Sequence, residues 1–255
     1  MPDTSPHPEP AHDLAPLLAD AERLGLALDA PAVEAFRGYL ALLLEWNERA
    51  GLTSLADPAE MQRRHFGESL ALLAVLRDAG IAPPGATARV ADLGPGGGFP
   101  GVPMRIAEPA LRLTLIESHQ RRAEFLRTLA AALALDAVEV QPERAEDAGR
   151  DPALRASFDL VVARALAPLP VLVEYALPLL RPGGTLAAPK GSRAQDDLDA
   201  ARGAIEALGG VALEPLALPV PAGEPPQTVL LVRREGDLDD RYPRRPGMPS
   251  KRPLT

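Results

Sequence analysis

The chain contains no cysteine and only four histidines among its 255 residues. The absence of thiols excludes disulfide bridges, thiolate metal ligands and cysteine nucleophiles. The histidines are scattered without the spacing of metal ligands, so we expect no bound metal. Any cofactor should therefore be organic.

Long hydrophobic runs are also missing. No apolar segment reaches the roughly 20 residues needed to cross a bilayer, and the N-terminal stretch lacks the basic and apolar regions of a signal peptide. We therefore expect a cytoplasmic protein with no membrane partner. Aromatic residues are few, with one Trp, three Tyr and five Phe. Ala, Leu and Val must fill the core instead, which favours helices packed on an aliphatic sheet.

The chain also lacks an excess of basic residues, since its formal net charge is −8. This charge argues against a nucleic-acid partner, because Lys and Arg make most phosphate contacts. Its distribution weakens that argument: residues 241–255 carry several Arg and Lys side chains and no acidic one. Local charge governs a contact over a Debye length of about 10 Å.

The chain divides into four segments by composition and periodicity. Residues 1–13 are polar and Pro-rich, and we expect a disordered leader there. Residues 14–80 show helical periodicity and should form an N-terminal helical cap. Residues 81–235 should form the main α/β domain, and 236–255 a basic, Pro-rich C-terminal tail, suited to an extended arm that follows phosphates.

Within the cap we expect helices over 14–28 and 31–48 and a third one to Leu76, with Asp57 as N-cap and Pro58 in the first turn. In the main domain, short apolar runs alternate with helical patterns. The expected strands are 89–93, 111–116, 138–141, 158–163, 185–189, 211–218 and 228–233, and the expected helices are 119–135, 171–180 and 194–208. Such alternation predicts parallel βαβ units in a doubly wound sheet.

The strongest chemical signal is the glycine-rich loop over 92–101, directly after the first expected strand. Gly94, Gly96 and Gly98 allow a tight turn and a close approach of backbone to ligand. Glu117 ends the next strand, about 20 residues beyond the loop, where an acid accepts hydrogen bonds from ribose hydroxyls. A tight structural turn and a dinucleotide site remain alternatives. The pattern acid-x-Gly-x-Gly-x-Gly looks like the adenosylmethionine loop of class I methyltransferases.

Further motifs narrow this interpretation. They are Gly-Phe-Pro-Gly-x-Pro at 98–103, Trp46-Asn47, Leu52-Thr53-Ser54, Asp57-Pro58, His65-Phe66 with Glu68-Ser69-Leu70, Glu117-Ser118 with Arg121-Arg122, Ala163-Arg164-Ala165, Lys190-Gly191 and Tyr242-Pro-Arg-Arg-Pro-Gly247. Together they resemble the RsmG family, also called glucose-inhibited division protein B, over residues 14–255.

The resemblance implies a class I S-adenosylmethionine-dependent methyltransferase fold, Rossmann-like, with an N-terminal helical cap. It also implies S-adenosyl-L-methionine as cofactor and methyl transfer to N7 of a guanine in 16S ribosomal RNA. The partner would be small-subunit ribosomal RNA or a ribosomal particle, and we expect a monomer. Two alternatives stay open: a class I methyltransferase acting on a small molecule or protein, and a non-catalytic dinucleotide-binding regulator or scaffold.

Carried over from the family, the cofactor-binding residues would be Gly94, Phe99, Glu117, Ser118, His119, Ala145, Glu146 and Arg164. Glu117 stands where the family commonly has Asp. Guanine N7 attacks with a free lone pair, so no general base is expected and positioning should supply the rate. Arg164 is the best candidate for positioning cofactor or base, and its alternative role is an ion pair with Asp92 or Glu146.

The RNA-binding candidates are Arg121, Arg122, Lys190, Arg244 and Arg245. Each of these side chains can instead be a solvated surface residue. Arg121 and Arg122 begin a helix, where positive charge opposes the helix dipole, so helix stability does not explain them. We expect residues 63–65 to form a solvated face of the cap, with His65 packing or capping locally.

Overall fold

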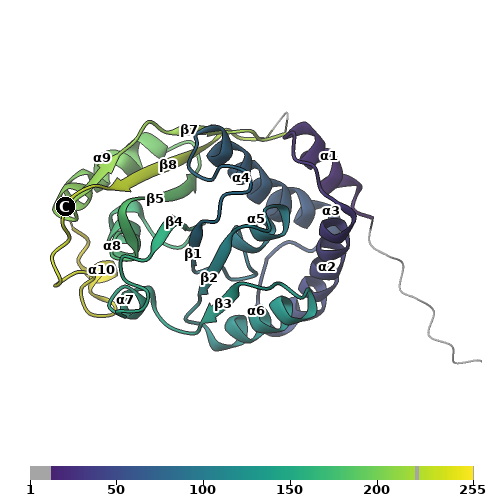
Figure 1. The fold of residues 1–255 in the computed structure, drawn as a ribbon, viewed down its shortest axis with the longest axis horizontal. Helices are drawn as coiled ribbons and strands as arrows, with labels where there is room; N and C mark the ends of the chain where they lie inside the picture. Colours follow the sequence, from purple (N-terminus) through teal and green to yellow (C-terminus); the bar gives the residue numbers. More distant parts are fainter. Residues whose placement is uncertain (1–12, 222–223, 255) are drawn as a thin grey trace, which may run out of the picture.

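The protein is described here from a computed structural model that covers residues 13–221 and 224–254. A central sheet lies between two layers of helices (Figure 1). Residues 1–12 of the expected leader lie outside the described residues. Asp13 accepts a hydrogen bond from the backbone N–H of Ala15 at 2.9 Å, at the start of the first helix.

The described residues form one eight-stranded sheet in the order β3-β2-β1-β4-β5-β8-β6, with β7 also paired to β8. The first five strands are parallel, and β8 runs antiparallel to β5. The predicted doubly wound α/β sheet is confirmed, and chain order reverses beside β1, where such sheets bind ligands. The strands are β1 Arg89–Leu93, β2 Arg112–Ile116, β3 Val138–Gln141, β4 Phe158–Val162, β5 Leu180–Lys190, β6 Gly210–Ala212, β7 Leu216–Leu218 and β8 Gln227–Arg234.

Successive residues of the central strands enter different cores. Val90 of β1 and Leu160 of β4 are paired neighbours that face one core, whereas Ala91 and Val161 face the other. All four are at most 1% exposed. Burial on both faces explains why these strands are continuous apolar runs and not alternating ones.

The helices divide between the two faces in the same way (Figure 1). Those of the cap and of the first two crossovers share one core with the sheet, so the cap is continuous with the main domain. They are α1 Ala15–Arg23, α2 Ala30–Ala50, α3 Pro58–Met61, α4 Glu68–Asp78, α5 Gly101–Ala107 and α6 Gln120–Ala132. The other face carries α7 Ala145–Ala148, α8 Leu169–Ala176, α9 Ala194–Ala207 and α10 Met248–Lys251.

The third cap helix differs from the single helix expected from Asp57 to Leu76. Asp57 is the N-cap as predicted, accepting from the N–H of Glu60 at 3.0 Å. A π-helical turn, η1, then occupies Gln62–Gly67 between α3 and α4. Such a turn changes the direction in which the following side chains point. A Cβ at Gly67 would collide with Asp20 of α1, so this glycine lets the turn pack closely against α1.

Two strand expectations were wrong. The helix expected over 171–180 ends at Ala176, and residues 180–184 belong to β5, where the register with β4 is irregular. A Cβ at Gly184 would lie 2.8 Å from the carbonyl oxygen of Phe158, so the glycine permits this close pairing. The strand expected over 211–218 is two strands, β6 and β7. Both pair antiparallel to β8, because the short connections there hold no crossover helix.

The C-terminal tail is packed, which corrects the extended arm expected there. Arg244 forms hydrogen bonds to both carboxylate oxygens of Glu174, at 2.6–3.1 Å, and Glu174 is fully buried. Gly247 donates its N–H to Glu146, and Ser250 bonds to the Tyr175 hydroxyl. Buried acids on α7 and α8 therefore fix a segment whose composition alone suggested a free chain.

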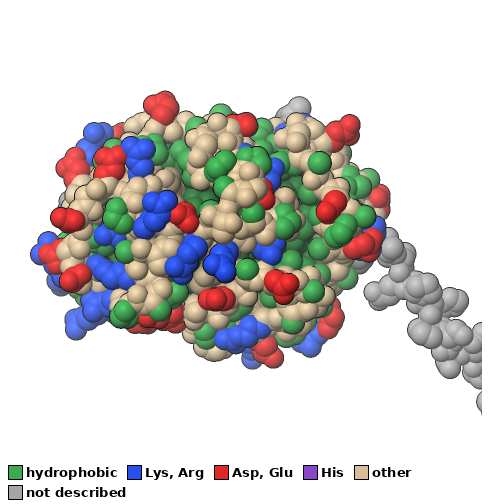
Figure 2. Space-filling view, in the orientation of Figure 1, with side chains coloured by type: hydrophobic (Ala, Val, Ile, Leu, Met, Phe, Trp, Pro, Cys, Tyr) green, Lys and Arg blue, Asp and Glu red, His purple; other side chains and the backbone are tan. Residues whose placement is uncertain are grey.

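Two kinds of feature are absent from the described part of the chain. Among these residues no helix is long and apolar enough to span a bilayer. The same residues contain no group of three or more His, Cys, Asp or Glu side chains placed to hold a metal ion. On the face drawn in Figure 2, acidic and basic side chains are interspersed.

Candidate active site

The glycine loop leaves the carboxyl end of β1 in a conformation that requires glycine. Gly94, Gly96 and Gly98 have φ angles of +63°, +56° and +99°. The N–H of Gly94 still donates to the Ile116 carbonyl at 2.9 Å, which ties the loop to β2. A Cβ on Gly96 would meet nothing within 4 Å, so the backbone there faces open space and is accessible to a ligand.

Glu117 lies beside this loop at the end of β2. One carboxylate oxygen accepts the N–H of Gly96 at 3.1 Å, and the other accepts the N–H of His119 at 2.8 Å. Glu117 is 5% exposed, whereas Ser118 and His119 are exposed next to it. The loop therefore has a fixed acidic acceptor along one side.

Asp92, the last residue but one of β1, is a fully buried acid beneath the loop. Its Oδ2 accepts the N–H of Gly101 at 2.7 Å, while no hydrogen-bond partner for Oδ1 exists among the described residues. Burial raises the pKa of Asp92 to about 7, against the lowering effects of the Gly101 hydrogen bond and the Arg164 charge. The described residues thus leave one buried oxygen of this acid without a hydrogen-bond partner.

An open cleft of about 830 Å³ separates the glycine loop from the cap. Its cap wall comes from the α2–α3 connection, η1 and the start of α4, and its sheet wall from the segments after β1, β4 and β5. Of the charged residues that line the cleft in the described structure, four are cations and one is a carboxylate: Arg64, Arg122, Arg164, Lys190 and Glu68. The cleft is therefore positively charged in a protein whose net charge is negative.

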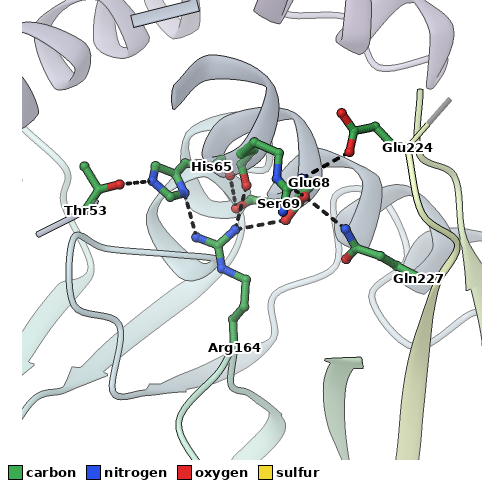
Figure 3. Close-up of polar contacts among 8 residues, drawn as sticks. Thr53, His65, Glu68, Ser69, Arg164, Glu224 and Gln227 are labelled. Carbon is green, nitrogen blue, oxygen red and sulfur yellow. Dashed lines mark hydrogen bonds and ion pairs between the residues drawn. The ribbon is translucent and has the colours of Figure 1, made fainter. Parts of the chain in front are cut away.

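Arg164, two residues beyond β4, joins the two walls (Figure 3). Its Nη1 donates to the Arg64 carbonyl at 2.8 Å and lies 3.4 Å from a Glu68 carboxylate oxygen. Its Nη2 lies 3.1 Å from Nδ1 of His65, and its guanidinium carbon lies 5.3 Å from the ring centre of Phe99. The ion-pair partner is thus Glu68, and neither Asp92 nor Glu146 takes that role.

His65 orients Arg164 from the cap. Burial and then the Arg164 charge lower the pKa of His65 to about 3, so the imidazole is neutral near pH 7. Its Nδ1 therefore accepts from Arg164, and its Nε2–H donates to Thr53 Oγ1 at 2.7 Å (Figure 3). The ring stacks on Phe99 at 4.5 Å. Arg63 and Arg64 are exposed, as expected for the solvated face at 63–65, and Arg64 also lines the cleft, whereas His65 packs locally on Phe99.

Tyr39 fixes the loop from α2. Its hydroxyl donates to the Gly97 carbonyl at 2.5 Å, and its ring stacks on Phe99 at 5.5 Å with an interplanar angle of 8°. Tyr39 is fully buried. Sequence reasoning missed this residue, since it occupies an ordinary apolar position in the helical pattern of α2.

The predicted cofactor residues lie in three places. Gly94, Phe99 and Arg164 line the cleft, and the Glu117 to His119 segment borders the loop on its β2 side. Ala145 begins α7. Glu146 is buried next to it, with its carboxylate directed to the N–H of Gly247. The Glu146 side chain therefore binds the tail.

The predicted RNA-binding residues also separate. Arg122 lines the cleft and donates to the Gly51 carbonyl at 3.0 Å, and Lys190 lines it with Nζ 3.7 Å from an Asp197 carboxylate oxygen. Arg121 lies in a different groove, beside Trp46. Arg244 is bound to Glu174, whereas Arg245 is exposed.

Comparison with known proteins gives consistent results. Residues 32–218 match the model of the family described as GidB, rRNA small subunit methyltransferase G. The ribosomal RNA small subunit methyltransferase G of Desulfitobacterium hafniense is 39% identical over 91% of this chain and 94% of its own length. That of Chloroflexus aggregans is 43% identical over 90% and 93%.

A solved structure agrees on the fold. The O-methyltransferase TomG from Streptomyces achromogenes, solved in complex with SAM, superposes with a TM-score of 0.53 over 86% of this chain and 96% of its own, at 20% identity. The sheet order and the helical layers are thus those of a class I methyltransferase. With its matched family model and its close relatives over nearly the whole length, the chain belongs to the rRNA small subunit methyltransferase G family.

Proposed function

We propose that this protein transfers the methyl group of S-adenosyl-L-methionine to N7 of a guanine in 16S ribosomal RNA. The observation that carries the proposal is a cleft, lined by four cations, that opens at the carboxyl ends of β1, β4 and β5 in a member of this family. We further propose that the protein acts as a cytoplasmic monomer on ribosomal RNA or a ribosomal particle.

The residues around the glycine loop fit this cofactor. Gly96 presents open backbone, Glu117 offers acceptors of the kind that bind ribose hydroxyls, and Asp92 Oδ1 is a buried acceptor suited to the amino group of the cofactor. Bound there, the cofactor supplies a methyl group activated by its sulfonium. Ser118 and His119, with the backbone of Ala145 and Glu146, complete the proposed cofactor site.

Catalysis in this proposal depends on positioning and not on proton transfer. Guanine N7 carries a free lone pair, so the protein needs only to hold it in line with the methyl group, an effect worth up to roughly 7–11 kcal/mol. Arg164 is held by a carbonyl, a neutral imidazole and a carboxylate, so its guanidinium is ordered before RNA binds. Arg122 and Lys190 line the cleft, and in this proposal they bind the flanking phosphates.

The test is transfer of labelled methyl groups from adenosylmethionine to ribosomal particles, and to their naked RNA, prepared from a strain that lacks this protein. We expect 7-methylguanosine in the small-subunit RNA, and a loss of at least about 100-fold in kcat/KM for Arg164→Ala, because a displaced positioning group costs on this order. Arg202→Ala is the matched control, since Arg202 is 72% exposed on α9 and does not line the cleft. Tight adenosylhomocysteine binding without transfer to RNA would contradict the RNA substrate and favour a small molecule or protein.

A further inference from the structure

Glu68 is the one carboxylate among the described residues that line the cleft. RNA phosphates would be repelled by it, and within the protein it pairs with Arg64 and Arg164. Its side chain is 14% exposed and belongs to the first residue of α4, at the end of the π-helical turn. From this place in the cleft wall it can also accept hydrogen bonds from a ligand that carries donors.

The contacts of Glu68 leave part of its acceptor capacity free (Figure 3). One oxygen is bound on two sides, by Nε of Arg64 at 3.0 Å and by Nε2 of Gln227 at 3.0 Å. The other has only the 3.4 Å contact to Arg164, which is long for a charge-assisted hydrogen bond. A carboxylate accepts about four hydrogen bonds, so this second oxygen can accept from a ligand while the first stays anchored.

We propose that Glu68 recognises the Watson–Crick edge of the guanine to be methylated, an inference that rests on the proposed function. Guanine presents two neighbouring donors on that edge, N1–H and the N2 amino group, and both can donate to the free carboxylate oxygen, since one carboxylate oxygen accepts about two hydrogen bonds. Adenine and cytosine each place an acceptor beside their donor, and uracil places acceptors on both sides of its single N–H. A carboxylate therefore selects guanine among the four bases.

The position of Glu68 also directs the reacting atom. In guanine, N7 lies on the opposite side of the purine from N1 and the N2 amino group. Glu68 is in the cap wall and the glycine loop is in the sheet wall. A base that binds Glu68 by its Watson–Crick edge thus turns N7 toward the loop. Apolar side chains line the space between the walls, as a base taken out of its stack requires, namely Leu55, Pro189, Pro225 and Pro226.

A functional-group substitution in the RNA tests this assignment. The substrate is the shortest RNA or reconstituted particle that the wild type methylates, with the mapped target guanine replaced by inosine, which lacks only the N2 amino group. We expect inosine to lower wild-type kcat/KM by about tenfold or more, since hydrogen bonds to charged groups are of this strength. In Glu68→Gln, which has the same shape, the inosine penalty should fall below about threefold.

The matched control is Glu224→Gln. Glu224 also pairs with Arg64, at 3.1 Å, but it is 42% exposed and does not line the cleft. This variant changes the charge beside Arg64 equally and should keep the full inosine penalty. Thermal unfolding of each variant shows whether it is folded, and Glu68→Asp, with a retracted carboxylate, replaces Glu68→Gln if that variant is inactive.

The outcomes separate the two proposals. An inosine penalty under about twofold in the wild type, or an equal penalty in wild type and Glu68→Gln, would overturn the role of Glu68 while 7-methylguanosine formation still supported the proposed function. If the wild type formed no 7-methylguanosine in any RNA, the proposed function itself would fail. A penalty that shrinks only in the Glu68 variants supports the assignment.

Discussion

The buried carboxyl group of Asp92 makes the stability of the site depend on pH. Its pKa rises from 3.8 to about 7 on folding, so between these values the folded protein binds a proton that the unfolded chain has released. The contribution of Asp92 to stability must then fall as pH rises from about 4 to about 7, and level off above, by an amount on the order of a few kcal/mol.

Asp92→Asn removes this titration while keeping an oxygen for the Gly101 N–H. We expect the difference in unfolding free energy, variant minus wild type, to increase from pH 4 to pH 7 and then stay constant. Urea unfolding of the ligand-free proteins at intervals of one pH unit measures it. A difference that is flat over this range would show that Asp92 is ionised in the folded protein throughout.

At the residue scale, sequence patterns identified the groups whose roles are local. In the sequence, Gly94 comes immediately after β1 and Arg164 two residues after β4, so their positions at the carboxyl ends of these strands were predictable. His65 and Tyr39 could not be assigned in this way. Each acts through a contact with a segment distant in sequence, Arg164 or Gly97, and only the packing of the cap on the loop creates these contacts.

At the scale of elements, the sequence predicted the strands β1 to β4 within a residue, since buried parallel strands are continuous apolar runs. The elements it missed depend on tertiary contacts. The π-helical turn forms where Gly67 packs on Asp20. The irregular start of β5 pairs with β4 although it contains a proline and two glycines, residues that normally end a strand. The tail was misjudged because the buried partners that hold it, Glu146 and Glu174, are more than 60 residues away.

The tail gives a prediction at this scale. Arg244→Ala leaves the Glu174 carboxylate buried without its cation, and we expect a loss of about 2–4 kcal/mol of stability, somewhat below the range for pairs buried on both sides. Arg245→Ala, next to it and exposed, should change stability by less than about 0.5 kcal/mol. Thermal and urea unfolding measure both. Unchanged stability together with a raised KM for RNA in Arg244→Ala would instead assign this arginine to the RNA contact.

At the scale of the whole molecule, the net charge of −8 and the basic cleft act in opposite directions on RNA. Beyond about 10 Å, salt screens the acidic surface, so local cations dominate once the RNA is bound. At very low salt this screening is lost, so RNA should associate more weakly with this acidic protein than with a basic one. Once the RNA is bound in the cleft, counterions should still be released from its phosphates. The cleft, and not the net charge, sets the number released.

The contribution of each cleft cation to the number of counterions released can be measured. Removing one phosphate contact to a single strand reduces the slope of log affinity against log salt by about 0.7. We expect Arg122→Ala and Lys190→Ala each to reduce it by about this amount, since both line the cleft, and Arg202→Ala on α9 to leave it unchanged. Titration of the RNA substrate between 50 and 300 mM salt provides the slopes. If both cleft variants kept the wild-type slope, phosphate binding would have to lie outside the cleft, and Arg121 beside Trp46 would become the next position to test.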